Sequence, residues 1–308
     1  SLLSGAASAG CGGSFCAIAT DEDALGPWTK PGWRLDLRGE FVRQSTLRSG
    51  RDKVSPAAAP DSTDESLTRN RNLLASLDYA WDERWGATVT LPWVGRRHEH
   101  TAYDAAGAAT AESWRFGRAG DARIVGRYQI SGLPDHEHAF GVQFGLKLPT
   151  GGTRQAFNAG VRAGEPLDRG LQLGSGTTDL LLGAYGFGEL AQDWGVFGQV
   201  LFQKPLAEKD GFKPGDGVNA NLGLRYTGFA AVTPHLQLSA RIEGRESGVN
   251  ADGENSGATL VYLSPGLTFT LSPRFQVYAF AQVPVAQRVT GLQIEPRWSA
   301  SLGLHWTL

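Results

Sequence analysis

The sequence predicts an all-β protein that folds as a transmembrane antiparallel up-and-down β-barrel of about twelve strands. Three observations predict it: residues alternate between apolar and polar, short and long connections alternate along the chain, and tryptophans lie at the ends of the alternating segments. The 308 residues include 41 glycines and nine tryptophans, a composition that favours strands and turns. No run of about 18 apolar residues is present, so we expect no transmembrane helix.

The alternation is clearest in the closing stretch EPRWSASLGLHWTL, residues 295–308. Every second residue from Pro296 to Leu308 is apolar, and the residues between are small or polar. This period of two describes a strand with one apolar and one polar face. Segments such as 33–41, 72–81 and 121–130 repeat the pattern. Each is close to the 9–11 residues that a tilted strand needs to cross a bilayer.

The connections predict the orientation of the barrel. Short turns are expected at 82–85, 131–136, 191–194, 232–235 and 271–274. Long polar loops are expected at 45–67, 97–113, 150–177, 204–217, 246–257 and 286–295. Their strict alternation is typical of an outer-membrane barrel, which has short periplasmic turns and longer external loops. We therefore expect the outer membrane of a Gram-negative bacterium, with both termini in the periplasm.

Tryptophans at segment ends are typical of the aromatic girdles that hold a barrel at the two membrane interfaces. A soluble β-sandwich gives no reason to place so many indoles at outward-facing segment ends. The predicted interface aromatics are Trp33, Trp81, Trp85, Trp93, Trp114, Trp194, Trp298 and Trp306.

The amino-terminal residues are expected to lie outside the barrel wall. Residues 1–9 look like the end of a secretory signal peptide, with Ala7-Ser8-Ala9 fitting the cleavage rule. Residues 10–32 are expected to form a periplasmic segment that could plug the pore, and residues 33–308 to form the barrel. Cys11 and Cys16 are predicted to form a disulfide, because an exported protein meets an oxidising compartment. Lipidation of Cys11 is the alternative.

The polar faces carry the charges that would line a pore. The net charge of −2 argues against a nucleic-acid partner. Basic rings favour anions, and we expect Arg123, Arg127, Arg241 and Arg245 to carry that selectivity, unless acidic neighbours neutralise them. The predicted pore-lining residues are Arg34, Asp36, Arg38, Glu40, Asp78, Asp121, Arg123, Arg127, Lys147, Arg225, Arg241, Glu243, Arg245 and Arg297.

Two histidine pairs are weak candidates for metal ligands. His98 and His100 share a strand face, as do His136 and His138, but the topology places the pairs on opposite sides of the membrane. Polar residues at a wet rim are the favoured interpretation of both pairs. No arrangement of serine, histidine and acidic residues predicts catalysis, and no cofactor is expected.

Two stretches carry a family resemblance. GVQFGLKLPTGG (141–152) and LQLGSGTTDLLLGAYGF (171–187) resemble the outer-membrane proteins of the meta-pathway phenol-degradation family. The resemblance extends over roughly residues 139–308 and implies a transporter barrel. It brings no agreed site residues with it.

The expected function is a channel or transporter for a small solute, anionic or aromatic. A non-conducting barrel that scaffolds a periplasmic or surface partner is the alternative, and a surface hydrolase a lower one. The expected partners are outer-membrane lipid and lipopolysaccharide, the barrel-insertion machinery during biogenesis, the unidentified solute and a potential periplasmic protein.

Overall fold

The computed structural model describes residues 31–55, 65–103, 109–131, 138–158, 160 and 163–308. The predicted signal remnant, the predicted disulfide between Cys11 and Cys16, nearly all of the predicted 10–32 segment and His136 lie outside these residues. The described residues contain no helix long and apolar enough to cross a membrane.

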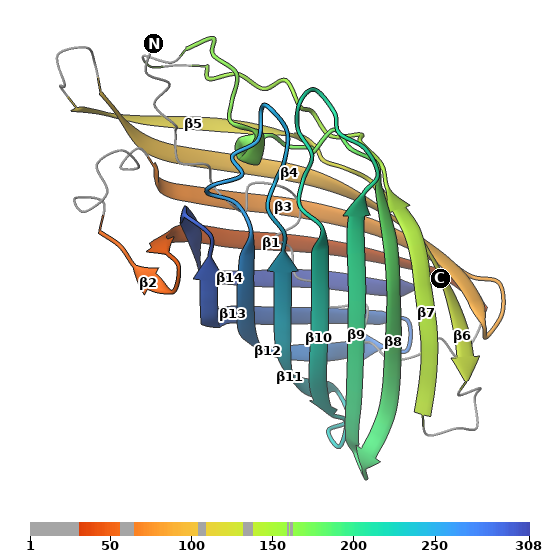
Figure 1. Ribbon diagram of the computed structural model, residues 1–308. Helices are drawn as coiled ribbons and strands as arrows, with labels where there is room; N and C mark the ends of the chain where they lie inside the picture. Colours follow the sequence, from red (N-terminus) through yellow and green to blue (C-terminus); the bar gives the residue numbers. More distant parts are fainter. Residues whose placement is uncertain (1–30, 56–64, 104–108, 132–137, 159, 161–162) are drawn as a thin grey trace.

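The described chain folds into one antiparallel sheet that closes on itself (Figure 1). Its strands are β1 (Gly32–Ser49), β2 (Asp52–Lys53), β3 (Glu65–Ala80), β4 (Trp85–Tyr103), β5 (Ala109–Ala119), β6 (Arg123–Ser131), β7 (His138–Lys147), β8 (Asp179–Ala191), β9 (Trp194–Pro205), β10 (Gly217–Tyr226), β11 (Val232–Glu243), β12 (Ala258–Ser272), β13 (Phe275–Val289) and β14 (Leu292–Thr307).

Closure comes from the pairing of the first strand with the last. The ladder between β1 and β14 runs from Arg34 opposite Thr307 to Ser49 opposite Leu292. β5 and β6 share one position in the wall, because both pair with β4. β6 pairs with the first half of β4, and β5 pairs with its second half. With β2 only a two-residue edge, the described strands occupy twelve positions, and the predicted twelve-stranded barrel is confirmed.

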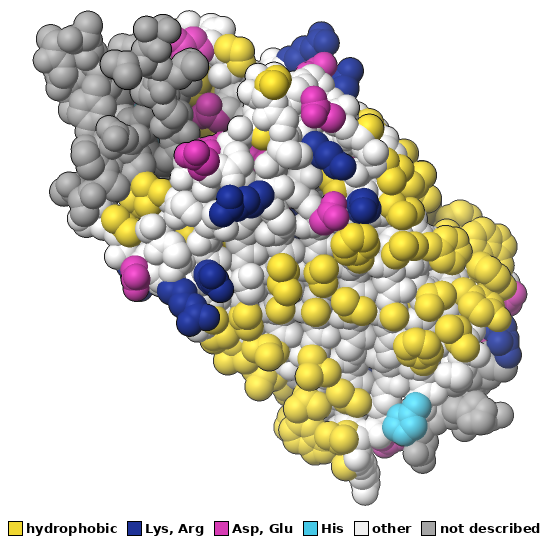
Figure 2. All heavy atoms as spheres, viewed as in Figure 1, with side chains coloured by type: hydrophobic (Ala, Val, Ile, Leu, Met, Phe, Trp, Pro, Cys, Tyr) yellow, Lys and Arg dark blue, Asp and Glu magenta, His cyan; other side chains and the backbone are white. Residues whose placement is uncertain are grey.

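The outer surface carries the apolar faces of the strands. Leu37, Leu73, Leu91 and Leu302 are among the exposed large hydrophobic side chains. Figure 2 shows that hydrophobic side chains cover most of the wall in that view, while Lys, Arg, Asp and Glu gather above them. This surface is the reverse of a soluble protein's, since large apolar areas are normally buried.

The strand bounds agree with most of the predicted short turns and long loops but not with a strict alternation, because the connection between β13 and β14 is only 290–291; three stretches differ from the prediction. The expected loop 97–113 is mostly the paired ends of β4 and β5, and the expected loop 286–295 is mostly the ends of β13 and β14. The expected turn 232–235 belongs to β11, so that the turn itself covers 227–231. Backbone pairing continues in these stretches without an alternating apolar face, so the hydrophobic pattern underestimates strand length there.

The short turn between β3 and β4 is closed by its own side chain. The carboxylate of Asp82 accepts hydrogen bonds from the backbone N–H of Trp85 at 2.7 Å and of Arg84 at 2.8 Å. These hydrogen bonds stabilise the charged form and hold the pKa of Asp82 below its usual value.

A bulge changes the face of β14 near its start. Gln44 of β1 lies opposite Pro296 while Arg43 lies opposite Trp298, which leaves Arg297 without a partner in the ladder. Beyond the bulge, the four consecutive residues 293–296 are all buried. Both faces of this end of β14 are therefore covered by other parts of the barrel.

Candidate functional site in the barrel interior

The inward faces of the strands carry most of the buried polar side chains. At the end with the short turns, the guanidinium of Arg127 forms an ion pair with Asp78, which also accepts a hydrogen bond from Thr88. His235 lies in the same region and shares a hydrogen bond of 3.0 Å with Thr268. The basic and acidic groups in this part of the interior are largely paired with each other.

Aromatic side chains fill the next part of the interior. Phe197 of β9 packs with Tyr278 and Phe280 of β13, and all three are buried. The Tyr278 hydroxyl donates to the Asp36 carboxylate, at 2.8 Å to Oδ2. A Cβ at Gly303 would overlap the Tyr278 ring, so only glycine lets this ring lie flat against the wall.

Arginines from three sides of the barrel form the next group, called here the arginine layer: Arg38 of β1, Arg123 of β6 and Arg241 of β11. Arg38 pairs with Glu40 at 3.0 Å. Arg241 donates to the Glu243 carboxylate from Nε at 3.2 Å and from NH2 at 3.1 Å.

Arg123 lies where these charges converge. It is repelled by Arg241 and Arg38 and attracted by Asp179 and Glu40, and the repulsive interactions are the larger ones. Charges on β1, β6, β8 and β11 therefore act on one guanidinium across the interior. Basic and acidic charges of the interior therefore meet at Arg123.

Lys147 is the centre of a buried network next to this layer. Its ammonium lies 3.0 Å from Oδ2 of Asp121 and 3.1 Å from Oδ2 of Asp179, and all three side chains have no exposed surface. It also donates to Ser175, and Thr177 donates to Asp179 at 2.6 Å. The network ties β7 and β8 to the break between β5 and β6.

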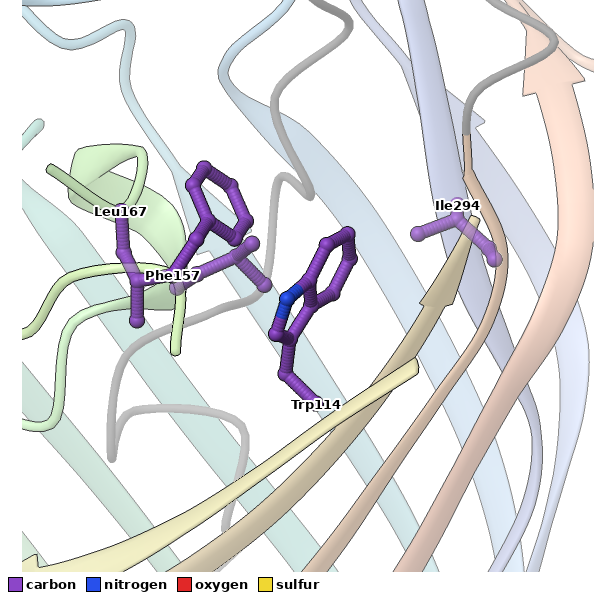
Figure 3. Close-up of a cluster of buried hydrophobic side chains, with 5 residues drawn as sticks. Trp114, Phe157, Leu167 and Ile294 are labelled. Atoms are coloured by element: carbon purple, nitrogen blue, oxygen red, sulfur yellow. The ribbon is translucent and has the colours of Figure 1, made fainter. Parts of the chain in front are cut away.

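The described part of the connection from β7 to β8, residues 148–158, 160 and 163–178, packs against the inner face of the barrel and is called here the folded-in loop. Its Phe157, Leu167 and Leu171 form a buried cluster with Trp114 of β5 and Ile294 of β14 (Figure 3). The rings of Trp114 and Phe157 lie 4.6 Å apart. The loop therefore occupies part of the interior at the end opposite the short turns.

Hydrogen bonds hold the folded-in loop at a second place. Arg96 of β4 donates from NH1 to the carbonyl oxygens of Gly170 at 3.0 Å and Gln172 at 3.3 Å. Its Nε donates at 2.7 Å to Asn70, which in turn donates to Gln44 at 3.1 Å. A buried row of side chains thus connects the wall to the loop.

Two further acidic groups, Glu246 and Glu295, interact with Glu243, the partner of Arg241. Burial and the nearby charge of Glu243 raise the pKa of Glu246, in the connection after β11, to about 7. Glu295 of β14 has no exposed surface and interacts electrostatically with Glu243, Arg48 and Arg241.

Most of the predicted pore-lining residues are partly or fully buried on the inward faces. Two of them are not. Arg245 lies beyond the end of β11 and is exposed, and Arg297 is exposed at the bulge of β14. The residues with buried or partly buried side chains are Arg34, Asp36, Arg38, Glu40, Asp78, Asp121, Arg123, Arg127, Lys147, Arg225, Arg241 and Glu243.

The prediction for Trp114 is wrong. This indole is 2% exposed and faces inward, since it packs under the folded-in loop against Phe157 and the ring of His100. β5 lies beyond the apolar outer surface of the wall. At that level, burial against the folded-in loop stabilises an aromatic side chain more than exposure on the outer surface does. The other predicted interface aromatics are exposed, namely Trp33, Trp81, Trp85, Trp93, Trp194, Trp298 and Trp306.

Of the predicted histidine pairs, the structure describes His98, His100 and His138, and the described residues contain no group of three or more His, Cys, Asp or Glu side chains that could hold a metal ion. His98 and His100 are buried beside Trp114, where His98 hydrogen-bonds to Thr68 at 2.9 Å and His100 lies 3.5 Å from Glu112. His138 is exposed at the start of β7.

The sequence interpretation missed Asp179, Arg96, Glu246 and Glu295. Asp179 begins a strand whose inward face continues with Leu181 and Tyr185, both buried, so no polar alternation marks it. Arg96 does alternate with His98 and His100 on one face, and that spacing was the available signal. Glu295 lies beyond the bulge, where the period of two no longer holds.

Comparison with solved structures places the fold among outer-membrane channels. The crystal structure of an outer-membrane channel from Pseudomonas putida F1 superposes with a TM-score of 0.67 at 13% identity, over 92% of this chain and 97% of that one. The NanC porin gives 0.48 at 11% identity over 89% and 100%. The Pseudomonas putida toluene transporter TodX gives 0.46 at 10% over 98% and 96%.

Sequence comparison gives no family. No family model matches the chain, and no curated protein matches it. The resemblance to the meta-pathway phenol-degradation family stays an expectation. The likeness to the Pseudomonas putida F1 channel is one of fold, that of a closed antiparallel barrel, which in this chain has twelve strand positions.

Proposed function

We propose that this protein is an outer-membrane channel that conducts a small organic anion, with both termini in the periplasm and the long connections outside. The outward apolar surface supports insertion in lipid, because a charged residue facing lipid at mid-depth costs about 2–4 kcal/mol. The likeness in fold to an outer-membrane channel supports the same conclusion.

The observation that carries the proposal is the arginine layer. Arg38, Arg123 and Arg241 reach into the interior from three parts of the wall, and the charges of Arg38 and Arg241 act on Arg123. Basic side chains gathered at one level of a pore favour a passing anion over a cation. Arg127 contributes less, because Asp78 neutralises it directly.

The aromatic group beside this layer supports an apolar part in the solute. Phe197, Tyr278 and Phe280 present rings toward the interior, and such rings bind flat apolar or aromatic groups. A small carboxylate with an apolar body suits both groups of residues.

Arg123→Gln is expected to reduce anion selectivity. In water, a unit charge at about 4 Å changes the energy of an ion by about 1 kcal/mol, so the chloride permeability should fall roughly fivefold and the chloride-to-potassium permeability ratio by at least as much. Reversal potentials across a planar bilayer under a KCl gradient measure this ratio.

Arg245→Gln is the matched control, because Arg245 is exposed and lies beyond the end of β11. It should leave the reversal potential unchanged. An unchanged potential in Arg123→Gln would contradict the anion path. A folded, inserted barrel that passes no current would favour the non-conducting scaffold.

A further inference from the structure

The carboxylate of Glu295 lies in an unusual environment. Its side chain has no exposed surface, and neither carboxylate oxygen has a hydrogen-bond partner among the described residues. A buried charge without a partner is costly, so such a group either takes up a proton or receives a cation.

The neighbouring charges do not supply that partner. Arg241 directs its Nε and NH2 to Glu243. Arg48 directs its Nε to Gln287 at 2.9 Å and its NH1 to a backbone carbonyl. The repulsion of Glu295 by Glu243 is larger than its attraction to either arginine. The surrounding protein thus favours a positive charge beside Glu295.

A third carboxylate strengthens this preference. Glu246 follows Glu243 closely in the chain, and it has a buried carboxylate oxygen, Oε2, without a hydrogen-bond partner among the described residues. Glu243 repels it as well. Glu243 of β11, which pairs with Arg241, therefore interacts with a second carboxylate in the connection after β11 and with a third in β14.

The arrangement suits an organic cation better than a metal ion. The described residues hold no set of three or more ligating side chains placed for a metal. An ammonium group needs fewer ligands and donates hydrogen bonds directly to carboxylate oxygens.

The two charged regions share one residue. Arg241 interacts electrostatically both with Arg123 and with Glu295. A small solute with opposite charges at its two ends can therefore contact both regions at once.

We propose that Glu295, together with Glu243, binds the ammonium group of a small amino carboxylate whose carboxylate group lies at the arginine layer. This inference rests on the proposed anion path and names the class of solute. The solute is a zwitterion, and its two charged ends are recognised by different walls of the barrel.

The test compares three probes of similar size in planar-bilayer recordings of the full chain: β-alanine, propionate and propylammonium. In the wild-type channel, β-alanine should interrupt the chloride current at a concentration roughly tenfold or more below the other two, since a charge-assisted hydrogen bond adds to each contact. Equal potency of β-alanine and propionate would overturn the inference.

Two variants separate this inference from the anion path. Glu295→Gln should remove the advantage of β-alanine and leave the action of propionate intact, whereas Arg123→Gln should weaken both probes. Glu208→Gln, at an exposed position between β9 and β10, is the matched control and should change neither. A Glu295→Gln channel that retains the advantage of β-alanine would show that Glu295 is merely protonated. A wild-type channel without anion selectivity would instead contradict the proposed function.

Discussion

Lys147→Met is expected to lower the free energy of unfolding by about 3–5 kcal/mol, the usual cost of breaking a buried ion pair from one side. Removal of the ammonium leaves Asp121 and Asp179 as two carboxylates that have no exposed surface and have lost the cation 3.0–3.1 Å from them. Urea unfolding followed by tryptophan fluorescence, or the heat-dependent gel mobility of the folded barrel, measures the loss.

Lys204→Met is the matched control for this change. Lys204 and Asp216 also form a lysine–aspartate pair, but it is 4.0 Å long and both side chains are about half exposed. Surface pairs contribute about 0–1 kcal/mol, so this variant should be nearly as stable as the wild type.

The triple variant Lys147→Met with Asp121→Asn and Asp179→Asn tests the cause. It removes the buried charges together, and it should recover much of the lost stability, because neutral groups of similar volume often replace buried ion pairs without cost. If the single variant lost no more than Lys204→Met, the buried network would not be the stabilising element described here.

Alternation predicted the barrel because the apolar face is a property of each strand on its own. In β14, Leu302, Leu304 and Trp306 are exposed as expected, while Ser299 between them and the bulge is buried and donates to Gln282 at 2.7 Å. A strand that must present one face to lipid leaves this period in the sequence wherever the ladder is regular.

The same rule fails where the chain leaves the regular ladder. Past the bulge at Arg297, four consecutive residues of β14, including Glu295, are buried, so that neither face of the strand is exposed there. The apolar–polar pattern on either side of a bulge does not reveal where the bulge lies. The backbone accommodates the extra residue, and no particular residue type marks its position.

The interior site depends on contacts that are distant in sequence. Trp114 is buried by Phe157 of the folded-in loop, and Lys147 faces acids from β8 and from the break before β6. Neither contact leaves a pattern in the nearby sequence, because the sequence of a polar loop is similar whether the loop projects outward or folds into the barrel. The charges of the interior were therefore predictable, and their pairing was not.

The last prediction concerns the attachment of the folded-in loop. Phe157→Ala should loosen the loop and raise the conductance of the channel. Phe157 is 2% exposed and packs against Trp114 with ring centres 4.6 Å apart. Replacing a buried phenylalanine with alanine costs about 3–5 kcal/mol, and part of that cost falls on the packed position of the loop.

The expected result is more frequent and larger open states in single-channel recordings. A loss of about 3 kcal/mol in the packed position would raise the detached population roughly 100-fold, at tenfold for each 1.4 kcal/mol. Arg96 and its two carbonyl partners would still hold the loop near Gly170, so the effect should be intermittent and not permanent.

Phe229→Ala is the matched control, because Phe229 is 57% exposed in the turn between β10 and β11, at the opposite end of the barrel. It should leave the open states unchanged. Urea unfolding of Phe157→Ala should show that the wall itself remains stable, since no strand ladder includes this residue. If the conductance stayed the same while the barrel remained folded, the prediction would be wrong. The solute path would then run beside the folded-in loop, along β8 to β12, and the loop would only stabilise the wall at Trp114.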